Sequence, residues 1–99
     1  MIVEFGASAE SDLERIGDHI AKDSPVRALS FVRELRETCL RLADAPQAFP
    51  LVARYGKFGI RRRVHGNFLI FYRVEPARIV VLHILHGAMD FERVLFPNG

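Results

Sequence analysis

The chain has 99 residues, of which 49% are hydrophobic and 26% charged, and its formal net charge at pH 7 is +2. This length allows one domain with one core, and this composition excludes a disordered or collagen-like protein. The longest apolar run, residues 68–72, is far too short to span a membrane. We also expect no secretory signal. The lone Cys39 excludes a disulfide framework, so the expected location is the cytoplasm.

The first part of the chain predicts a short strand followed by two helices. The start of the sequence alternates apolar and polar side chains, as a strand does. The first helix should begin at Ser8 or at Ser11, because Ser11 and Glu14 have the spacing of a capping box. The second should begin at Pro25 with Ser24 as its N-cap, and the short link between the helices predicts an antiparallel hairpin. Apolar side chains at helical spacing should face the core: Leu13, Ile16, Ile20, Ala28, Phe31, Val32, Leu35, Cys39 and Leu42.

The second part predicts three strands after a proline-containing linker. The strands are expected over residues 60–64, 68–74 and 79–86, and a short C-terminal helix can follow with Phe91, Leu95 and Phe96 turned inward. The resulting order, β-α-α-β-β-β, indicates an α+β domain. In this fold class a helical hairpin packs on one face of a mostly antiparallel four-stranded sheet.

Basic residues are concentrated in the segment 54–74, which carries no acidic residue: Arg54, Lys57, Arg61, Arg62, Arg63 and Arg73. Such a block suits an acidic partner, either a protein or a nucleic acid. A solvated basic edge without a partner is the alternative interpretation.

The turn after the three consecutive arginines decides which face of the sheet each of them takes. A two-residue turn would pair His65 with Phe68, whereas a three-residue loop with Asn67 left-handed would pair Val64 with Phe68. We favour the three-residue loop because it gathers the apolar side chains on one face, and a slip of one residue exchanges the faces. The face toward the helices would then hold Ile60, Val64, Phe68, Ile70 and Tyr72, with Arg62 as a misfit, and the other face Arg61, Arg63, Leu69, Phe71 and Arg73.

Alternation in the last strand extends this division. Val80, Leu82 and Ile84 should face the helices, and Ile79, Val81, His83 and Leu85 the other side. An apolar area rimmed by arginine is typical of a protein-binding surface. The alternative is that the chain's own C-terminal segment covers this face. The predicted partner-binding residues are Arg61, Arg63, Leu69, Phe71, Arg73, Val81, His83 and Leu85.

Three stretches resemble the RelE/ParE superfamily of type II toxin–antitoxin toxins: "DLERIGDHIAKDSPVRALSFVRELRETCLRLADAP", "YGKFGIRRRVHGNFLIFYRV" and "IVVLHILHGAMDFERVLF". The combination of "HGNFLIFYRV" with "LHILHGAMD" is similar to the ParE branch. The resemblance implies a single toxin domain over residues 1–99 with the fold derived above. It also implies a bacterial, cytoplasmic growth inhibitor that is neutralised by a co-encoded antitoxin.

The two branches of the superfamily differ in target, since ParE-type toxins act on DNA gyrase and RelE-type toxins cut mRNA on the ribosome. RNA cleavage needs proton transfer and stabilisation of an anionic phosphate. The positions that match the RelE-type nuclease residues are Leu69, Met89 and about Leu95, which cannot ionise. We therefore predict a ParE-like gyrase inhibitor rather than an enzyme. The alternatives are an RNase using Arg61, Arg63, Arg73 and His83, or a solitary family member without toxicity.

The resemblance also implies a partner, a ParD-like antitoxin with an acidic C-terminal segment that folds across the toxin. Two surfaces can receive it, the groove along the helical hairpin and the sheet face described above. No metal or cofactor is expected, because His83 and His86 point to opposite faces of a strand. Direct nucleic-acid contact through the arginines is not favoured, because no reading helix accompanies them.

Overall fold

The computed structural model describes residues 1–97, except for the side chains of residues 54–56. Within this part, no helix is long and apolar enough to cross a membrane. The order of the main elements confirms the predicted β-α-α-β-β-β arrangement with a short C-terminal helix. In chain order the elements are β1 Ile2–Phe5, α1 Ala7–Ala21, α2 Pro25–Leu40, the 3-10 turns η1 Arg41–Asp44 and η2 Ala53–Phe58, β2 Ile60–His65, β3 Phe68–Val74, β4 Arg78–His86 and α3 Phe91–Leu95.

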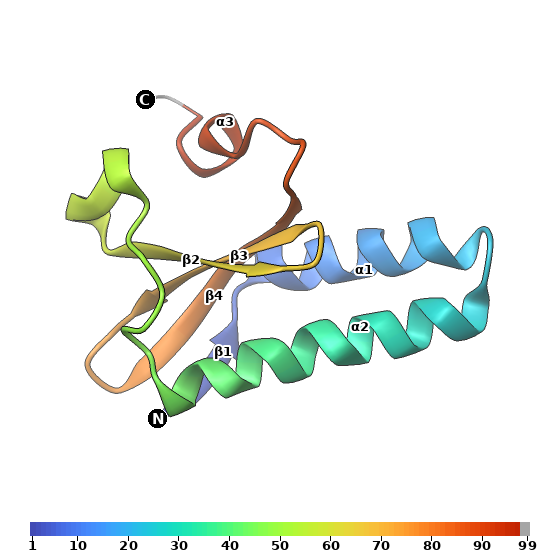
Figure 1. Ribbon diagram of the computed structural model, residues 1–99, viewed down its shortest axis with the longest axis horizontal. Coiled ribbons are helices and arrows are strands. Elements are labelled where there is room, and N and C mark those ends of the chain that lie inside the picture. Colours follow the sequence, from blue (N-terminus) through green and yellow to red (C-terminus); the bar gives the residue numbers. More distant parts are fainter. Residues whose placement is uncertain (98–99) are drawn as a thin grey trace.

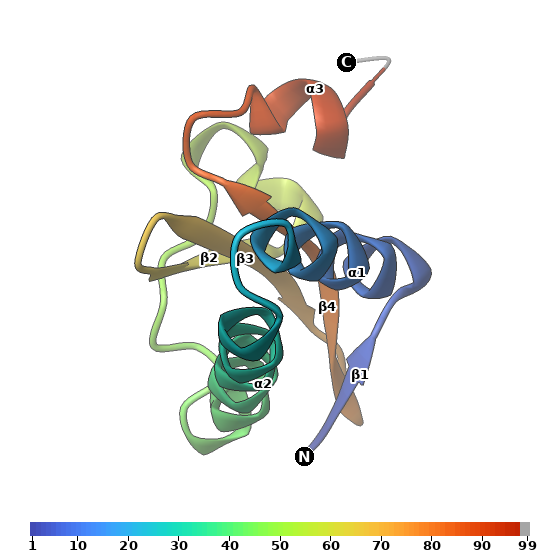
Figure 2. The same cartoon turned by 90° about the vertical axis from the view of Figure 1, so that its right-hand side faces the viewer.

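The four strands form one mixed sheet with the order β1-β4-β3-β2. The β1 strand runs parallel to β4, whereas the pairs β2/β3 and β3/β4 are antiparallel. The α1 and α2 helices pack as a hairpin on one face of the sheet, and α3 lies on the opposite side (Figures 1 and 2). This arrangement is the expected α+β fold, with β1 as the one parallel edge strand.

The two long helices begin for different reasons. Ser24 caps α2, since its hydroxyl oxygen accepts a hydrogen bond of 3.2 Å from the backbone N–H of Arg27, and Pro25 follows as predicted. The predicted start of α1 at Ser8 or Ser11 is wrong, because α1 begins one residue after Gly6. The Gly6 N–H donates to the carbonyl of Val81 at 2.9 Å. The last hydrogen bond between β1 and β4 is therefore made by the residue just before the helix. The sheet, rather than a capping box, therefore sets the start of α1.

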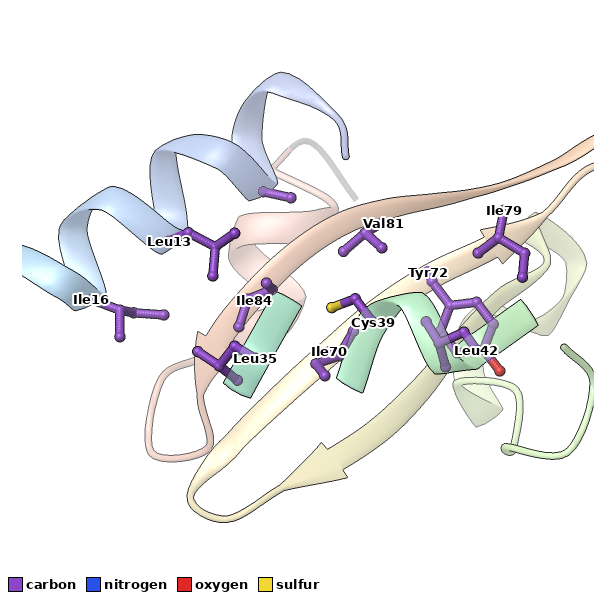
Figure 3. Packing of buried hydrophobic residues seen from close by; sticks show 11 residues of the cluster. Leu13, Ile16, Leu35, Cys39, Leu42, Ile70, Tyr72, Ile79, Val81 and Ile84 are labelled. Atoms are coloured by element: carbon purple, nitrogen blue, oxygen red, sulfur yellow. The ribbon is translucent and has the colours of Figure 1, made fainter. Parts of the chain in front are cut away.

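The main core lies between the hairpin and the sheet (Figure 3). The predicted stripes of both helices reach it, and Leu35, Cys39 and Leu42 are fully buried. Tyr72 enters the same core and keeps its hydroxyl satisfied by donating to the carbonyl of Pro46 at 2.7 Å. Each such apolar side chain contributes about 1.5–3 kcal/mol on burial. The fully buried members are Ala9, Leu13, Leu35, Cys39, Leu42, Ile70, Tyr72, Ile79, Val81 and Ile84.

The hairpin between β2 and β3 corrects the predicted register. His65 pairs with Phe68 through a two-residue turn, in which Gly66 has a φ of 58° and Asn67 is not left-handed, as in type II′ turns. The three-residue loop was therefore wrong. One residue of difference exchanges the faces of β2. Arg61 and Arg63 face the helices, while Ile60, Arg62 and Val64 face the other side.

A bulge in β4 overturns the predicted alternation there as well. Phe71 pairs with His83 but Tyr72 pairs with Val81, so Leu82 is an extra residue. Ile79 and Val81 consequently face the helices together with Ile84, whereas Leu82 packs on the second face. The predicted sides of Ile79, Val80, Val81 and Leu82 were wrong, and those of Ile84 and Leu85 are confirmed.

The second face of the sheet carries its own smaller core. Phe71 and Leu85 are fully buried there, and the ring of Phe91 from α3 lies 5.1 Å from that of Phe71 between centroids. The C-terminal segment therefore covers this face, which was the alternative interpretation of its apolar surface. The members are Val52, Ile60, Phe71 and Leu85, with Leu69, Leu82, Phe91, Val94, Leu95 and Phe96 packed around them.

Candidate partner-binding site

The residues predicted to form one partner-binding surface do not lie together. Val81 is buried beneath the helices, whereas Phe71 and Leu85 are buried on the opposite face. Arg61 and Arg63 lie on the helix side of the sheet. The prediction that these residues share one face was therefore wrong, because the turn between β2 and β3 and the bulge in β4 each shift the alternation by one residue. Leu69, Arg73 and His83 remain around the second face.

Arg61 fastens the linker that follows α2. Its Nη1 donates to the backbone carbonyls of Phe49 at 2.7 Å and Gln47 at 3.3 Å. These carbonyls belong to a segment without regular hydrogen bonding, so the guanidinium satisfies acceptors that would otherwise lack a protein partner. The guanidinium of Arg61 is thus bound to neutral acceptors within the chain, and no carboxylate among the described residues neutralises its charge.

Arg63 has a comparable role at the end of α2. Its guanidinium carbon lies 4.7 Å from the ring centroid of Phe49, in a cation–π contact, and its Nη1 lies 3.5 Å from the carbonyl oxygen of Thr38. Arg41 donates to the Thr38 hydroxyl at 3.2 Å. Positive charge is favourable at this C-terminal end of a helix. No carboxylate among the described residues pairs with Arg41, Arg61 or Arg63.

Buried Asp12 joins α1 to β4 beyond the part of that strand that pairs with β1, and sequence reasoning missed it. Its side chain is only 4% exposed, and one carboxylate oxygen accepts from His83 Nδ1 at 2.8 Å and from the Ile84 N–H at 2.9 Å. The other oxygen accepts from Arg15. Its position in the sequence could have indicated this burial, because Asp12 lies on the apolar stripe of α1, next to Leu13. The Asp12 carboxylate thus orients the His83 ring and accepts the hydrogen bond of a backbone N–H at the edge of β4.

Only part of the alternative RNase set comes together. His83 and Arg73 line one cavity of about 410 Å³, but Arg61 and Arg63 are on the other side of the sheet. Arg73 is also tied to Glu75 by hydrogen bonds of 2.9 and 3.2 Å. The pKa of Glu75 is lowered, chiefly by its hydrogen bond with Arg78 and then by that with Arg73. The four side chains therefore do not converge on one reacting group.

Cys39 and the two histidines of the last strand offer little chemistry. Burial raises the pKa of the Cys39 thiol to about 12, which makes it a core residue without thiolate character near neutral pH. His83 is held by Asp12, and His86 accepts from the backbone N–H of Ala88 at 3.1 Å. Among the described residues, no three histidine, cysteine or carboxylate side chains come together to hold a metal ion.

A groove runs along the outer side of the helical hairpin, with a volume of about 910 Å³. Small residues deepen it where the helices approach: a Cβ on Gly17 would lie 3.2 Å from a methyl of Val32. Leu29 of α2 forms part of its wall and is 72% exposed. A large apolar side chain so exposed beside a groove is typical of a partner-binding surface.

One end of this groove is closed by an ion pair between the helices. The Glu10 carboxylate of α1 and the Arg36 guanidinium of α2 form two hydrogen bonds, of 2.7 and 3.0 Å. This bidentate contact lowers the pKa of Glu10 and raises that of Arg36. Two further acids of α1, Glu14 and Asp18, line the groove farther along.

A comparison with known families decides the identity of the fold. The family model described as "ParE toxin of type II toxin-antitoxin system, parDE" matches residues 3–91. The chain belongs to the ParE toxin family. A solved chain of the "Chromosomal ParDE TA system from P. aeruginosa" is similar, with a TM-score of 0.76 and 24% identity over 87% of this chain and 95% of that chain. This likeness shows a shared ParE fold, while no curated protein matches the sequence.

The positions of the RelE-type nuclease residues are apolar in this ParE toxin, and the structure gives them other roles. Leu69 and Leu95 pack in the core of the second face, and Met89 is partly exposed just beyond β4. None of the three side chains can transfer a proton or stabilise a phosphate by charge.

Proposed function

We propose that this ParE family member inhibits bacterial growth by binding DNA gyrase in the cytoplasm and is neutralised by a cognate antitoxin. The observation that carries the proposal is the match of the ParE family model over residues 3–91. The apolar side chains at Leu69, Met89 and Leu95 support inhibition by binding rather than by RNA cleavage. The sequence resemblance to the ParE branch supplies gyrase as the target.

The hairpin groove is the place we assign to the antitoxin. It is long, apolar at its floor and open to a helix that would lay one face against α1 and α2. The similar solved chain comes from a system named ParDE, which supports a paired antitoxin for this chain too. The other surface expected from the sequence is less suitable, because α3 already covers the apolar side chains there.

A second contact is proposed at the cations near the end of α2. Arg41, Arg61 and Arg63 have no carboxylate partner among the described residues, so an acidic antitoxin segment would complement them. Electrostatic steering would then make the association rate fall as salt is added, since exposed charges are screened beyond about 8 Å at physiological ionic strength.

The proposed target is tested with purified toxin and gyrase in a DNA supercoiling assay. We expect supercoiling to stop with increasing toxin and to recover when the antitoxin encoded beside the toxin gene is added. Untouched supercoiling together with cleavage of ribosome-bound mRNA would establish the RNase alternative instead. Expression without growth arrest would establish a family member without toxicity.

A further inference from the structure

Three acids of α1 form a single row along the hairpin groove. Glu10, Glu14 and Asp18 are spaced four residues apart, which places them one above the other on the same side of a helix. All three line the groove. The wall on the α1 side is therefore acidic along its length, although the protein as a whole carries a net charge of +2.

Two of these acids have free charge. Glu10 is already neutralised by Arg36. Glu14 and Asp18 make no ion pair with any of the side chains that the structure describes. Arg15 pairs with Asp12 instead. Lys22 lines a neighbouring cavity with Glu14 and Asp18 but makes no ion pair with any described residue.

The opposite wall of the groove has a different character. On α2 it is formed by Leu29 and Val32 before Arg36 closes the end. The groove is therefore apolar along its floor and α2 wall and negative along its α1 wall. A helix lying in it would need an apolar face toward α2 and cationic side chains on the flank that meets Glu14 and Asp18.

Resting on the proposed docking of an antitoxin helix in this groove, we propose that Glu14 and Asp18 are specificity-determining residues that select a helix with lysine or arginine along one flank. An acidic flank would be repelled by the same two carboxylates. The antitoxin segment would then be bipolar: basic where it meets α1, and acidic where it meets the cations at the end of α2. The proposal thus adds a basic flank to the antitoxin with an acidic C-terminal segment that the sequence predicts.

The test uses two synthetic helical peptides of about 18 residues, five helical turns. They share one apolar face, and a flank carries lysines in one peptide and glutamates in the other. Binding to the full chain is measured by fluorescence anisotropy. We expect the lysine peptide to bind about tenfold more tightly, since two exposed charge contacts change sign, and this advantage should shrink with added salt.

The variant E14Q/D18N should remove the difference between the two peptides. E37Q is the matched control, because Glu37 is an exposed acid of α2 that does not line the groove, and it should keep the full difference. Equal affinity of both peptides for the unmodified chain would overturn the selectivity. Failure of both to bind would overturn docking in the groove.

A second copy of the chain is the competing occupant. If the protein is a dimer in solution and L29E makes it a monomer, the groove belongs to self-association and the proposal is wrong. A monomer before and after the substitution supports it. None of these measurements depends on gyrase, so a toxin that leaves supercoiling unchanged can still discriminate between the peptides, and the two proposals fail separately.

Discussion

The arginines of β2 and the acids of α1 are both clusters of like charge, but the fold uses them differently. Arg61 and Arg63 stand out in the sequence, yet Arg61 is held by backbone carbonyls and Arg63 by the ring of Phe49 and the carbonyl of Thr38. Glu14 and Asp18 resemble an ordinary solvated helix face, yet they line the groove and form no ion pair with the side chains that the structure describes. A conspicuous run of charge in the sequence is therefore a poor guide to which side chains lack contacts within the chain.

The backbone next to each cluster explains the difference. The linker after α2 contains Pro46 and Pro50 and lacks regular hydrogen bonding, so its carbonyls attract the nearest guanidinium. Within α1 the backbone groups bond to one another, so the acidic side chains on its outer surface find no unpaired backbone N–H to accept from. Arg61 and Arg63 are thus bound by carbonyls that lack regular partners, whereas Glu14 and Asp18 lie on a regular helix that offers no such unpaired backbone group.

The largest expected effect concerns Asp12, the buried acid through which α1 is bonded to β4. We expect D12A to lower the free energy of unfolding by about 3 kcal/mol, because it leaves a buried N–H of Ile84 and the His83 ring without their acceptor. Chemical denaturation measures this loss. E14A, two residues away, should change stability by less than about 0.5 kcal/mol. Similar losses for both variants would erase the distinction between engaged and free acids.

A smaller loss is expected at the arginines. The double variant R61A/R63A should lower the unfolding free energy by about 2 kcal/mol, because hydrogen bonds from charged donors are lost but these side chains are partly exposed. Thermal and urea unfolding would both report it. R62A is the control, since Arg62 faces the other side of β2 and has no side-chain hydrogen bond within the described residues. If R61A/R63A is as stable as R62A, the two arginines are not needed to hold the linker and the end of α2.

The smallest effect separates the paired acid of the groove, Glu10, from its neighbours. The hydrogen bond with Arg36 lowers the pKa of Glu10. Its stabilisation is therefore present above the unfolded pKa of about 4.3 and is lost as the pH falls through the lower folded value. We expect E10Q to flatten the dependence of stability on pH in this acidic range by no more than about 0.5 kcal/mol. In an R36Q background, E10Q should leave that dependence unchanged; a persisting effect would assign it to another partner.

Local sequence patterns determined much of this protein. The positions of the strands, the apolar stripes of both helices and the Ser24–Pro25 start of α2 depend on neighbours within a few residues, and the structure confirms them. Three motif stretches also indicated the ParE family, which the family model confirms.

Only the tertiary structure decided the faces of the sheet and the charges left free. The register was predicted on the assumption that one face would be cleaner than the other, but α3 buries the second face as well, so alternation could not distinguish the two registers. The bulge at Leu82 and the bond from Asp12 to His83, residues 71 positions apart, depend on how α1 meets β4. Such features arise from contacts between segments that are distant in the sequence. Neither segment carries a local sequence signal for the contact, because its local sequence is compatible with the structure around it whether or not the contact forms.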